Sequence, residues 1–95
     1  MIVIGTDTHK KSHTCAAVFA QTGQLVGELT ASARKAGFAE LLDWGRGLDP
    51  ERIWAIEDCR HVSGSFERFL LASGERVLRV APKIMGASRR GVQCQ

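Results

Sequence analysis

The sequence predicts an α/β fold in which a mixed five-stranded sheet carries two helices. Three observations support this fold class. The first part of the chain contains short apolar segments whose connections are too brief for a parallel crossover, so they should pair as antiparallel strands. The later part alternates between helical and strand periodicity, which is typical of parallel strands joined by helices. The length of 95 residues suits one small domain with a single core.

The first three strands are expected at residues 2–5, 14–19 and 25–31. The first segment is β-branched and continuously apolar, as in a strand buried on both faces at the centre of a sheet. Asp7 lies at the exit of this strand, and residues 9–12 form a polar turn to the second strand. Residues 21–24 contain Gly23 and form a hairpin turn to the third. These three strands therefore form an antiparallel meander.

Two amphipathic helices alternate with two more strands in the rest of the chain. Apolar residues at i, i+3, i+4 and i+7 spacing define one face of each helix. These stripes are Phe38, Leu41, Leu42 and Gly45 in the first helix, and Val62, Phe66, Phe69 and Leu70 in the second. The strands are expected at residues 52–57 and 77–80, and Pro82 closes the last one. We expect one domain over residues 1–82, followed by a loose basic segment over residues 83–95.

The order of these elements predicts the topology of the sheet. A meander followed by two right-handed crossovers places the strands, numbered along the chain, in the order 3-2-1-4-5. The first, fourth and fifth strands are then parallel. This is the order of the ribonuclease H-like fold, and it also begins each half of the actin-like ATPase fold.

Two acidic residues end neighbouring parallel strands in this topology. Asp7 and Glu57 follow strands about 4.8 Å apart, so their carboxylates can converge at the carboxyl edge of the sheet. Paired carboxylates suit Mg²⁺ or Mn²⁺, which take oxygen ligands and leave positions for phosphate and water. Asp58 competes with Glu57, but Ile53, Ala55 and Glu57 share a parity that favours Glu57. The alternative is that Asp7 caps a turn and Glu57 a helix start.

Several basic residues are candidates for contacts with phosphate. The chain has a formal net charge of +3 and a pI near 9.1, which permits a polyanionic partner without requiring one. Lys10 and Lys11 follow Asp7 directly, and Lys83, Arg89 and Arg90 form a basic C-terminal segment. Both groups could contact a nucleic-acid backbone. The alternative is that they are solvated surface charges.

Histidines and cysteines raise the question of a zinc site. The candidate ligands are His9, His13, Cys15, Cys59 and His61. No C-x₂-C pair occurs, so polar turn histidines and a buried thiol are the favoured interpretation. The odd number of cysteines indicates free thiols in a reducing cytosol. With no membrane-length apolar run and no signal-peptide core, we expect a cytoplasmic protein that does not enter a membrane.

The order of these motifs resembles a known family. The residues that carry the resemblance are 4–14, Val18, Gly23, Glu57, 79–83 and 88–90. Together they resemble the amino-terminal domain of the DEDD transposases, the insertion sequence one-ten group that also contains the Piv-type DNA invertases. The opening motif is fairly specific to that group, and the match spans nearly the whole chain.

The resemblance implies a RuvC-like domain whose acids, in the order Asp, Glu, Asp, Asp, bind divalent metal and act on DNA phosphodiesters. Asp7 matches the first acid and Glu57 the second. No Asp follows Asp58, and nothing matches the family's carboxy-terminal domain with its nucleophilic serine. We therefore expect a fragment of a transposase or site-specific recombinase, incomplete at the C-terminus, that binds metal weakly and is inactive alone. For the intact protein the resemblance implies DNA and a guide-type non-coding RNA as partners, and an uncovered sheet face predicts a homo-oligomer.

Two other functions stay open from the residues alone. Gly5-Thr6-Asp7 after a strand is also compatible with an actin-like ATPase or kinase fragment, but Thr8-His9-Lys10-Lys11 replaces the glycine-rich hairpin that would hold phosphate. A non-catalytic nucleic-acid-binding module that uses the basic surface is the other alternative. ATP binding detected by calorimetry would favour the ATPase or kinase fragment. Salt-dependent binding of DNA or RNA that Asp7→Ala leaves unchanged would favour the nucleic-acid-binding module.

Overall fold

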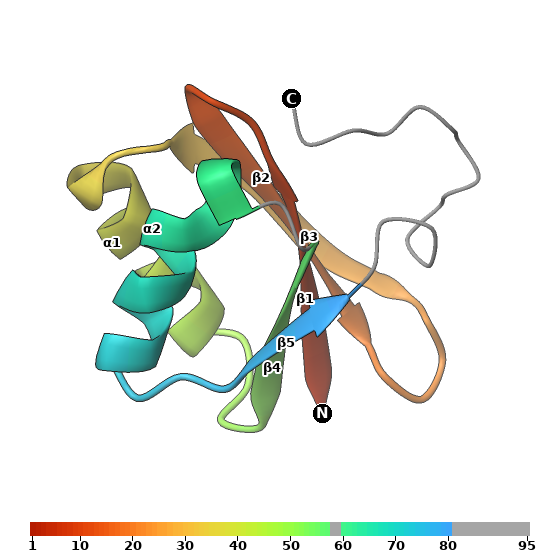
Figure 1. The fold of residues 1–95 in the computed structure, drawn as a ribbon. Helices are drawn as coiled ribbons and strands as arrows, with labels where there is room; N and C mark the ends of the chain where they lie inside the picture. Colours follow the sequence, from red (N-terminus) through yellow and green to blue (C-terminus); the bar gives the residue numbers. More distant parts are fainter. Residues whose placement is uncertain (58–59, 81–95) are drawn as a thin grey trace.

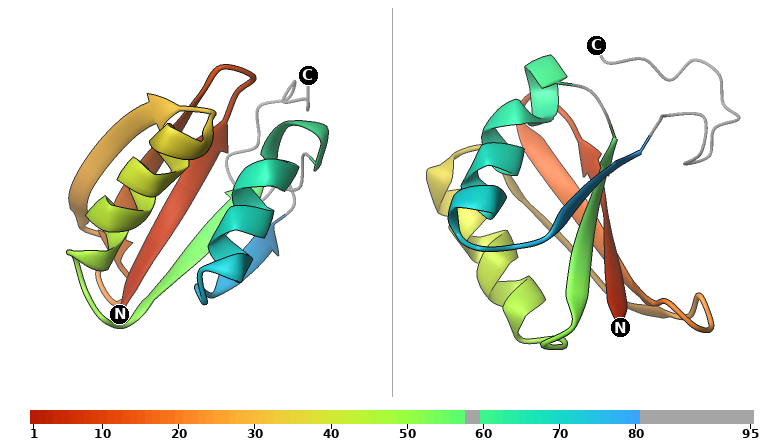
Figure 2. Two further views of the ribbon diagram at one scale, coloured as in Figure 1. Left: turned by 90° about the vertical axis from the view of Figure 1, so that its left-hand side faces the viewer. Right: turned by 60° about the horizontal axis from the view of Figure 1, so that its bottom comes forward.

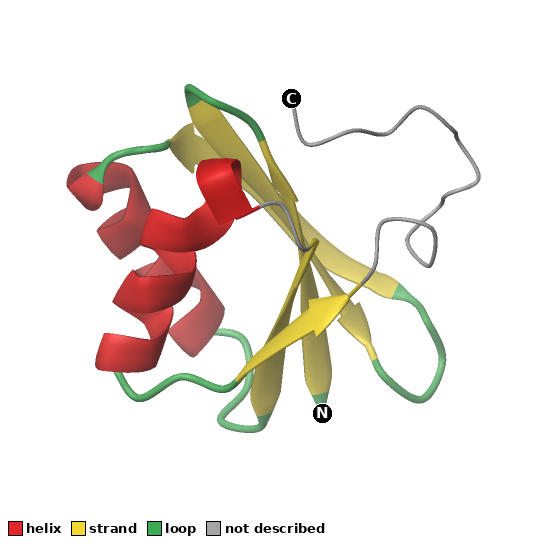
Figure 3. Ribbon diagram, in the orientation of Figure 1, coloured by secondary structure: helices red, strands yellow, loops and turns green. Residues whose placement is uncertain are grey.

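The computed structural model describes residues 1–57 and 60–80, with the side chains of residues 60–63 left out (Figure 1, Figure 3). The elements are β1 (Ile2–Thr8), β2 (Ser12–Phe19), β3 (Leu25–Ser32), α1 (Lys35–Arg46), β4 (Arg52–Glu57), α2 (Arg60–Ala72) and β5 (Val77–Val80). Every strand and helix expected from the sequence is present. The expected basic segment at residues 83–95, with Lys83, Arg89 and Arg90, lies outside the described residues, as do Asp58 and Cys59.

The sheet has the expected topology. Its strands lie in the order β3-β2-β1-β4-β5. β2 is antiparallel to both β1 and β3, whereas β4 is parallel to both β1 and β5. This mixed α/β sheet with its helical crossovers is the ribonuclease H-like arrangement, so the fold class predicted from the sequence is confirmed.

Both helices lie on one face of the sheet, and the core lies between them and the strands (Figure 2). The strands contribute alternate residues to this face because side chains alternate along a strand. The largest fully buried side chains there include Trp54, Phe66, Ile4, Leu41 and Leu70. The rings of Trp54 and Phe66 meet edge to face, with centroids 5.8 Å apart. The core is therefore aliphatic around a small aromatic centre.

The opposite face of the sheet carries the other set of alternating side chains. Within the described residues no helix covers this face (Figure 1, Figure 2). Val3 and Ile53 lie on it half-buried, while Leu78 is 50% exposed. Asp7 belongs to the same face because it shares the parity of Val3 and Gly5.

The first hairpin differs from the sequence prediction. β1 continues through Asp7 to Thr8, and β2 begins at Ser12, so the turn is shorter than expected. The added residues pair across the hairpin, with Asp7 opposite Thr14 and Thr8 opposite His13. Asp7 is therefore inside the end of a strand rather than beyond it. The cross-strand hydrogen bonds of β2 extend β1 past the point where its apolar run stops.

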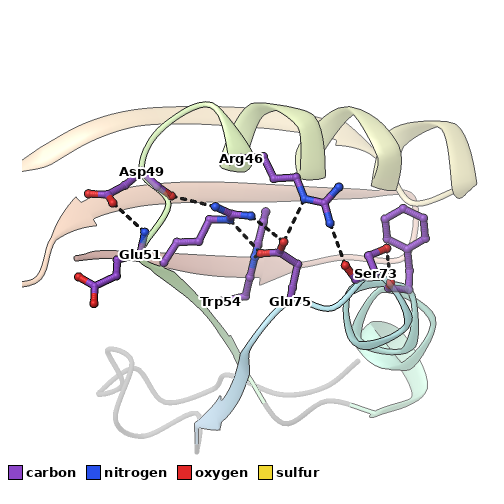
Figure 4. A network of polar contacts seen from close by, with 8 residues as sticks. Arg46, Asp49, Glu51, Trp54, Ser73 and Glu75 are labelled. Atoms are coloured by element: carbon purple, nitrogen blue, oxygen red, sulfur yellow. Dashed lines mark hydrogen bonds and ion pairs between the residues drawn. The ribbon is translucent and has the colours of Figure 1, made fainter.

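The amino end of the parallel strands is held by one buried carboxylate (Figure 4). Glu75 precedes β5, and its side chain is 5% exposed. It accepts hydrogen bonds from Trp54 Nε1 at 2.8 Å, Arg52 Nη2 at 2.8 Å and Arg46 Nε at 3.1 Å. Burial alone raises the pKa of this carboxyl, but the hydrogen bonds outweigh burial and lower the pKa to about 2. Glu75 thus joins α1 and β4 to the start of β5.

Two glycines set how closely α1 approaches the sheet. A Cβ on Gly45 would lie 2.6 Å from the Trp54 ring, which is closer than a side chain can pack. A Cβ on Gly37 would overlap the backbone carbonyl oxygen of Ser32 at the end of β3. The first turn of α1 is therefore fixed against the end of β3, near the carboxyl edge of the sheet (Figure 1).

Candidate active site at the carboxyl edge of the sheet

The register of β1 and β4 brings Asp7 and Glu57 to adjacent positions. Gly5 pairs with Ala55 and Thr6 with Ile56, so Asp7 and Glu57 are the next residues along the two parallel strands. Residues at matching positions of parallel strands project from the same face. Both side chains therefore lie on the uncovered face of the sheet, at its carboxyl edge.

Electrostatics supports this adjacency. The pKa of Glu57 is raised, first by its partial burial and then by the negative charge of Asp7, while His9 opposes the rise. Asp7 itself is open to solvent, with its side chain 67% exposed. The geometry and the charges agree that the two carboxylates are close neighbours. Asp58, the competing residue, lies outside the described part of the chain.

His9 lies beside Asp7, a contact that the sequence interpretation did not predict. It was weighed as a zinc ligand and favoured as a polar residue of the turn, and its Nε2 atom lies 3.3 Å from Asp7 Oδ2. Both side chains are well exposed, at 62% and 67%. The signal available in the sequence was the i, i+2 spacing of Asp7 and His9, which places both on one face if the strand continues past Asp7. The imidazole therefore faces the carboxylate from the beginning of the turn.

The side chains at this edge supply part of the ligand set of a divalent cation. Asp7 and Glu57 offer carboxylate oxygens on one face, which suits Mg²⁺ or Mn²⁺ held by two protein ligands together with water and phosphate. Among the side chains of residues 1–57 and 64–80, no group of three or more His, Cys, Asp or Glu is arranged to hold a metal ion. The described residues therefore fit part of a hard-cation site and do not form a closed metal cage.

The turn between β1 and β2, which follows Asp7, carries two lysines. Lys10 and Lys11 are both exposed. The carbonyl of Lys11 accepts a 2.9 Å hydrogen bond from the backbone N–H of Ala33, which ties this turn to the start of α1. A phosphate at the Asp7 edge would lie near two mobile ammonium groups. Their role in binding nucleic acid stays a prediction.

The other histidine of the motif has a different environment from the one expected. His13 was interpreted as a polar turn residue, but it lies within β2 and is 1% exposed. Its ring stacks on Phe38 with centroids 5.7 Å apart and meets Phe66 at 5.4 Å. Burial lowers its pKa and favours the neutral ring. In the described part of the chain, His13 Nδ1 and Thr8 Oγ1 are buried side-chain atoms without a hydrogen-bond partner.

Cys15 is a buried free thiol, as expected from the sequence. Burial raises its pKa to about 11, and a 3.5 Å contact with the Thr6 hydroxyl only partly offsets this. A thiol with such a pKa is a poor metal ligand and nucleophile. Together with the position of His13 in the aromatic core, this disfavours a zinc site built on these two residues.

Comparisons with known proteins agree with the fold and the motif. A family model described as a transposase, of the IS110 type with a DEDD motif, matches residues 4–93. No match was found among curated proteins. The crystal structure of the Aquifex aeolicus member of the Ppx/GppA protein family is similar in fold, with a TM-score of 0.51 and 16% sequence identity. That match covers 90% of this chain but 37% of the Aquifex aeolicus chain.

The structure also bears on membrane association. Among the helices of the described residues, neither is long and apolar enough to cross a membrane.

Proposed function

The chain belongs to the IS110-type DEDD transposases, and we propose that Asp7 and Glu57 are the first two acids of an active site that acts on DNA phosphodiesters with a divalent cation. The observation that supports this most is the register of β1 and β4, which puts the two carboxylates side by side on one face. The raised pKa of Glu57 agrees with it, because a negative neighbour disfavours a second negative charge.

The acids and the basic turn have different roles in the proposed site. When bound, Mg²⁺ or Mn²⁺ neutralises phosphate charge and activates an attacking hydroxyl. Asp7 and Glu57 supply the oxygen ligands, and the contact from His9 restricts the rotation of the Asp7 carboxylate. Lys10 and Lys11 attract the phosphate backbone and orient it toward the acids. We propose that Lys83, Arg89 and Arg90 also contact nucleic acid.

The intact protein is proposed to be a cytoplasmic transposase or site-specific recombinase that works with DNA and a guide-type non-coding RNA. In this proposal residues 1–82 form the partial catalytic domain and residues 83–95 a basic segment. The uncovered sheet face, with Val3, Ile53 and Leu78, supports association with another copy or another part of the protein. A strictly monomeric chain in light scattering would contradict self-association.

Calorimetric titration with Mn²⁺ tests the two acids directly. Asp7→Asn and Glu57→Gln should each weaken Mn²⁺ binding by more than about tenfold, since losing even an outer-shell partner has an effect of that size. Glu28→Gln is the matched control, because Glu28 is an exposed acid on β3 opposite Ala16. Equal Mn²⁺ binding by Asp7→Asn and the unaltered chain would contradict the proposal.

Binding measurements with ATP and with nucleic acid, beside the Mn²⁺ titration, separate the other candidate functions. Binding of ATP that depends on Asp7 would favour an ATPase or kinase fragment. Salt-dependent nucleic-acid binding, combined with no Mn²⁺ binding at all, would favour a non-catalytic module.

A further inference from the structure

A groove lies between the first turn of α1 and the middle of α2. Its volume is about 510 Å³. The residues that line it are Ala33, Arg34, Lys35, Phe38, Ser65, Arg68 and Phe69. None of them is acidic, three are cationic, and the two phenylalanines form an apolar floor. The groove therefore joins positive charge to an aromatic surface.

The cations of this groove lack the partners that other arginines have. Arg46 and Arg52 both pair with Glu75. By contrast, within residues 1–57 and 60–80 neither Arg34 nor Lys35 makes an ion pair or a side-chain hydrogen bond. Arg68 contacts the Ser65 hydroxyl at 3.4 Å, a neutral partner that leaves its charge uncompensated.

The position of two of these cations works against the stability of α1. Arg34 is the N-cap residue and makes no side-chain capping hydrogen bond, and the first turn contains no acid. Lys35 is the first residue of the helix. Cations are unfavourable at this end because the helix dipole is positive there, and acids or Ser, Thr, Asp and Asn caps are preferred. Helix stability therefore does not explain why these two residues stand where they do.

The groove lies on the helix-covered side of the sheet, and one backbone contact joins its lining to the turn that follows Asp7. The hydrogen bond between the Ala33 N–H and the Lys11 carbonyl joins the lining of the groove to the β1–β2 turn. Lys10 and Lys11 lie on that turn, just beyond Asp7 in β1. Cations therefore stand both on the turn that follows Asp7 and in the groove.

We propose that this groove binds the backbone of a single DNA strand that continues from the Asp7 edge, with Arg34, Lys35 and Arg68 on phosphates and a base against Phe69. The inference rests on the proposed function, because that function makes DNA the polyanion at this edge. Charge complementarity favours phosphate as the occupant. The aromatic floor favours unpaired bases, since a duplex keeps its bases stacked inside.

Fluorescence anisotropy with labelled single-stranded DNA in EDTA tests the groove without any metal. An oligonucleotide of about 20 nucleotides exceeds the sites of about 4–16 nucleotides that comparable single-strand grooves occupy. Arg34→Gln and Arg68→Gln should each reduce the slope of log K against log salt by about 0.7, and the double variant by about 1.4. Arg76→Gln is the control, because this exposed cation lies before β5 at the opposite end of the sheet.

The outcomes separate the groove from the two-acid site. DNA binding in EDTA reports on the groove, whereas unchanged Mn²⁺ binding by Asp7→Asn would contradict the proposed function alone. The groove proposal is overturned if Arg34→Gln and Arg68→Gln bind DNA with the salt slope of Arg76→Gln. It is also overturned if RNA of the same sequence binds more than tenfold tighter than DNA and loses that advantage in the double variant, because the groove would then be an RNA site. Thermal unfolding checks that all variants fold.

Discussion

The carboxylates at the two ends of the parallel strands have opposite environments. At the amino end, Glu75 is buried and bound by Arg46, Arg52 and Trp54 Nε1. At the carboxyl end, Asp7 is exposed beside His9. The cations near that end, from Lys10 to Arg34, have no carboxylate partner in the described residues other than those of the candidate site.

Strand β4 makes the contrast explicit, because each of its ends lies near one carboxylate. Arg52 at its start lowers the pKa of Glu75, whereas Glu57 at its end has a raised pKa. A satisfied carboxylate stabilises the fold, and an unsatisfied pair costs stability until a cation joins it. The fold is therefore held together by paired charges at the amino end, whereas at the carboxyl end two carboxylates lie next to each other.

The largest predicted effect is the loss of the carboxylate at the amino end. Glu75→Gln should lower the free energy of unfolding by about 3 kcal/mol, because it leaves buried cationic groups without their partner. Urea unfolding measures this change. Glu51→Gln is the matched control, since Glu51 is an exposed acid next to Arg52. If Glu75→Gln and Glu51→Gln lower the free energy of unfolding by equally small amounts, Glu75 does not hold this end of the sheet.

The same carboxylate predicts how stability depends on pH. The pKa of Glu75 is about 2 in the folded chain, against an ordinary value of 4.5. Its contribution, about 3 kcal/mol, is therefore fully present above pH 4.5 and is lost as the pH falls toward 2. Unfolding curves measured across this range should fall steeply for the unaltered chain and less steeply for Glu75→Gln. Parallel curves for the two proteins would refute this assignment.

An intermediate effect is predicted at the start of α1, which shapes one wall of the groove. Gly37→Ala should cost about 2 kcal/mol, because the new methyl group would overlap the Ser32 carbonyl and push the helix from β3. Gly64→Ala is the control: its Cβ would meet only the flexible tip of Arg68, at 3.3 Å. That change should stabilise α2 by about 0.5 kcal/mol. Similar thermal stability of the two variants would argue against close packing at Gly37.

The smallest predicted effect has the opposite sign and lies at the carboxyl end. Without metal, Asp7→Asn should raise the free energy of unfolding by about 0.5 kcal/mol, because it removes the repulsion between neighbouring carboxylates. Asp43→Asn, at an exposed position of α1, should not stabilise the chain in this way. Chemical denaturation with and without Mn²⁺ measures both. Destabilisation by Asp7→Asn in EDTA would mean that Asp7 has a structural role.

Local patterns predicted most of the fold because they depend on neighbouring residues. The alternation of Ile53, Ala55 and Glu57 identified the face of β4, and the short connections identified the meander. These rules also placed Asp7 and Glu57 at one edge, and the register agrees with that placement. What they could not provide was the extent of β1, because Asp7 and Thr8 are polar and their pairing depends on β2.

Contacts between distant segments were beyond local reasoning. Glu75 follows a helix-ending glycine and reads as a surface acid, yet three groups from α1 and β4 converge on it. His13 is a polar residue next to the expected turn, but its ring completes an aromatic cluster with Phe38 and Phe66. The sequence offers one local indication of the groove cations: Arg34 and Lys35 stand at the start of a helix, where acids are preferred.

The pKa of Glu57 is the measurement that tests the central claim most directly. Side-chain NMR titration of the metal-free chain should give a value above the ordinary range for a glutamate, as burial and Asp7 both require. Asp7→Asn should lower it, and so should saturating Mg²⁺ in the unaltered chain, while Glu28→Gln should leave it unchanged. A Glu57 pKa that responds to neither Asp7→Asn nor Mg²⁺ would show that the two acids do not form a shared cation site.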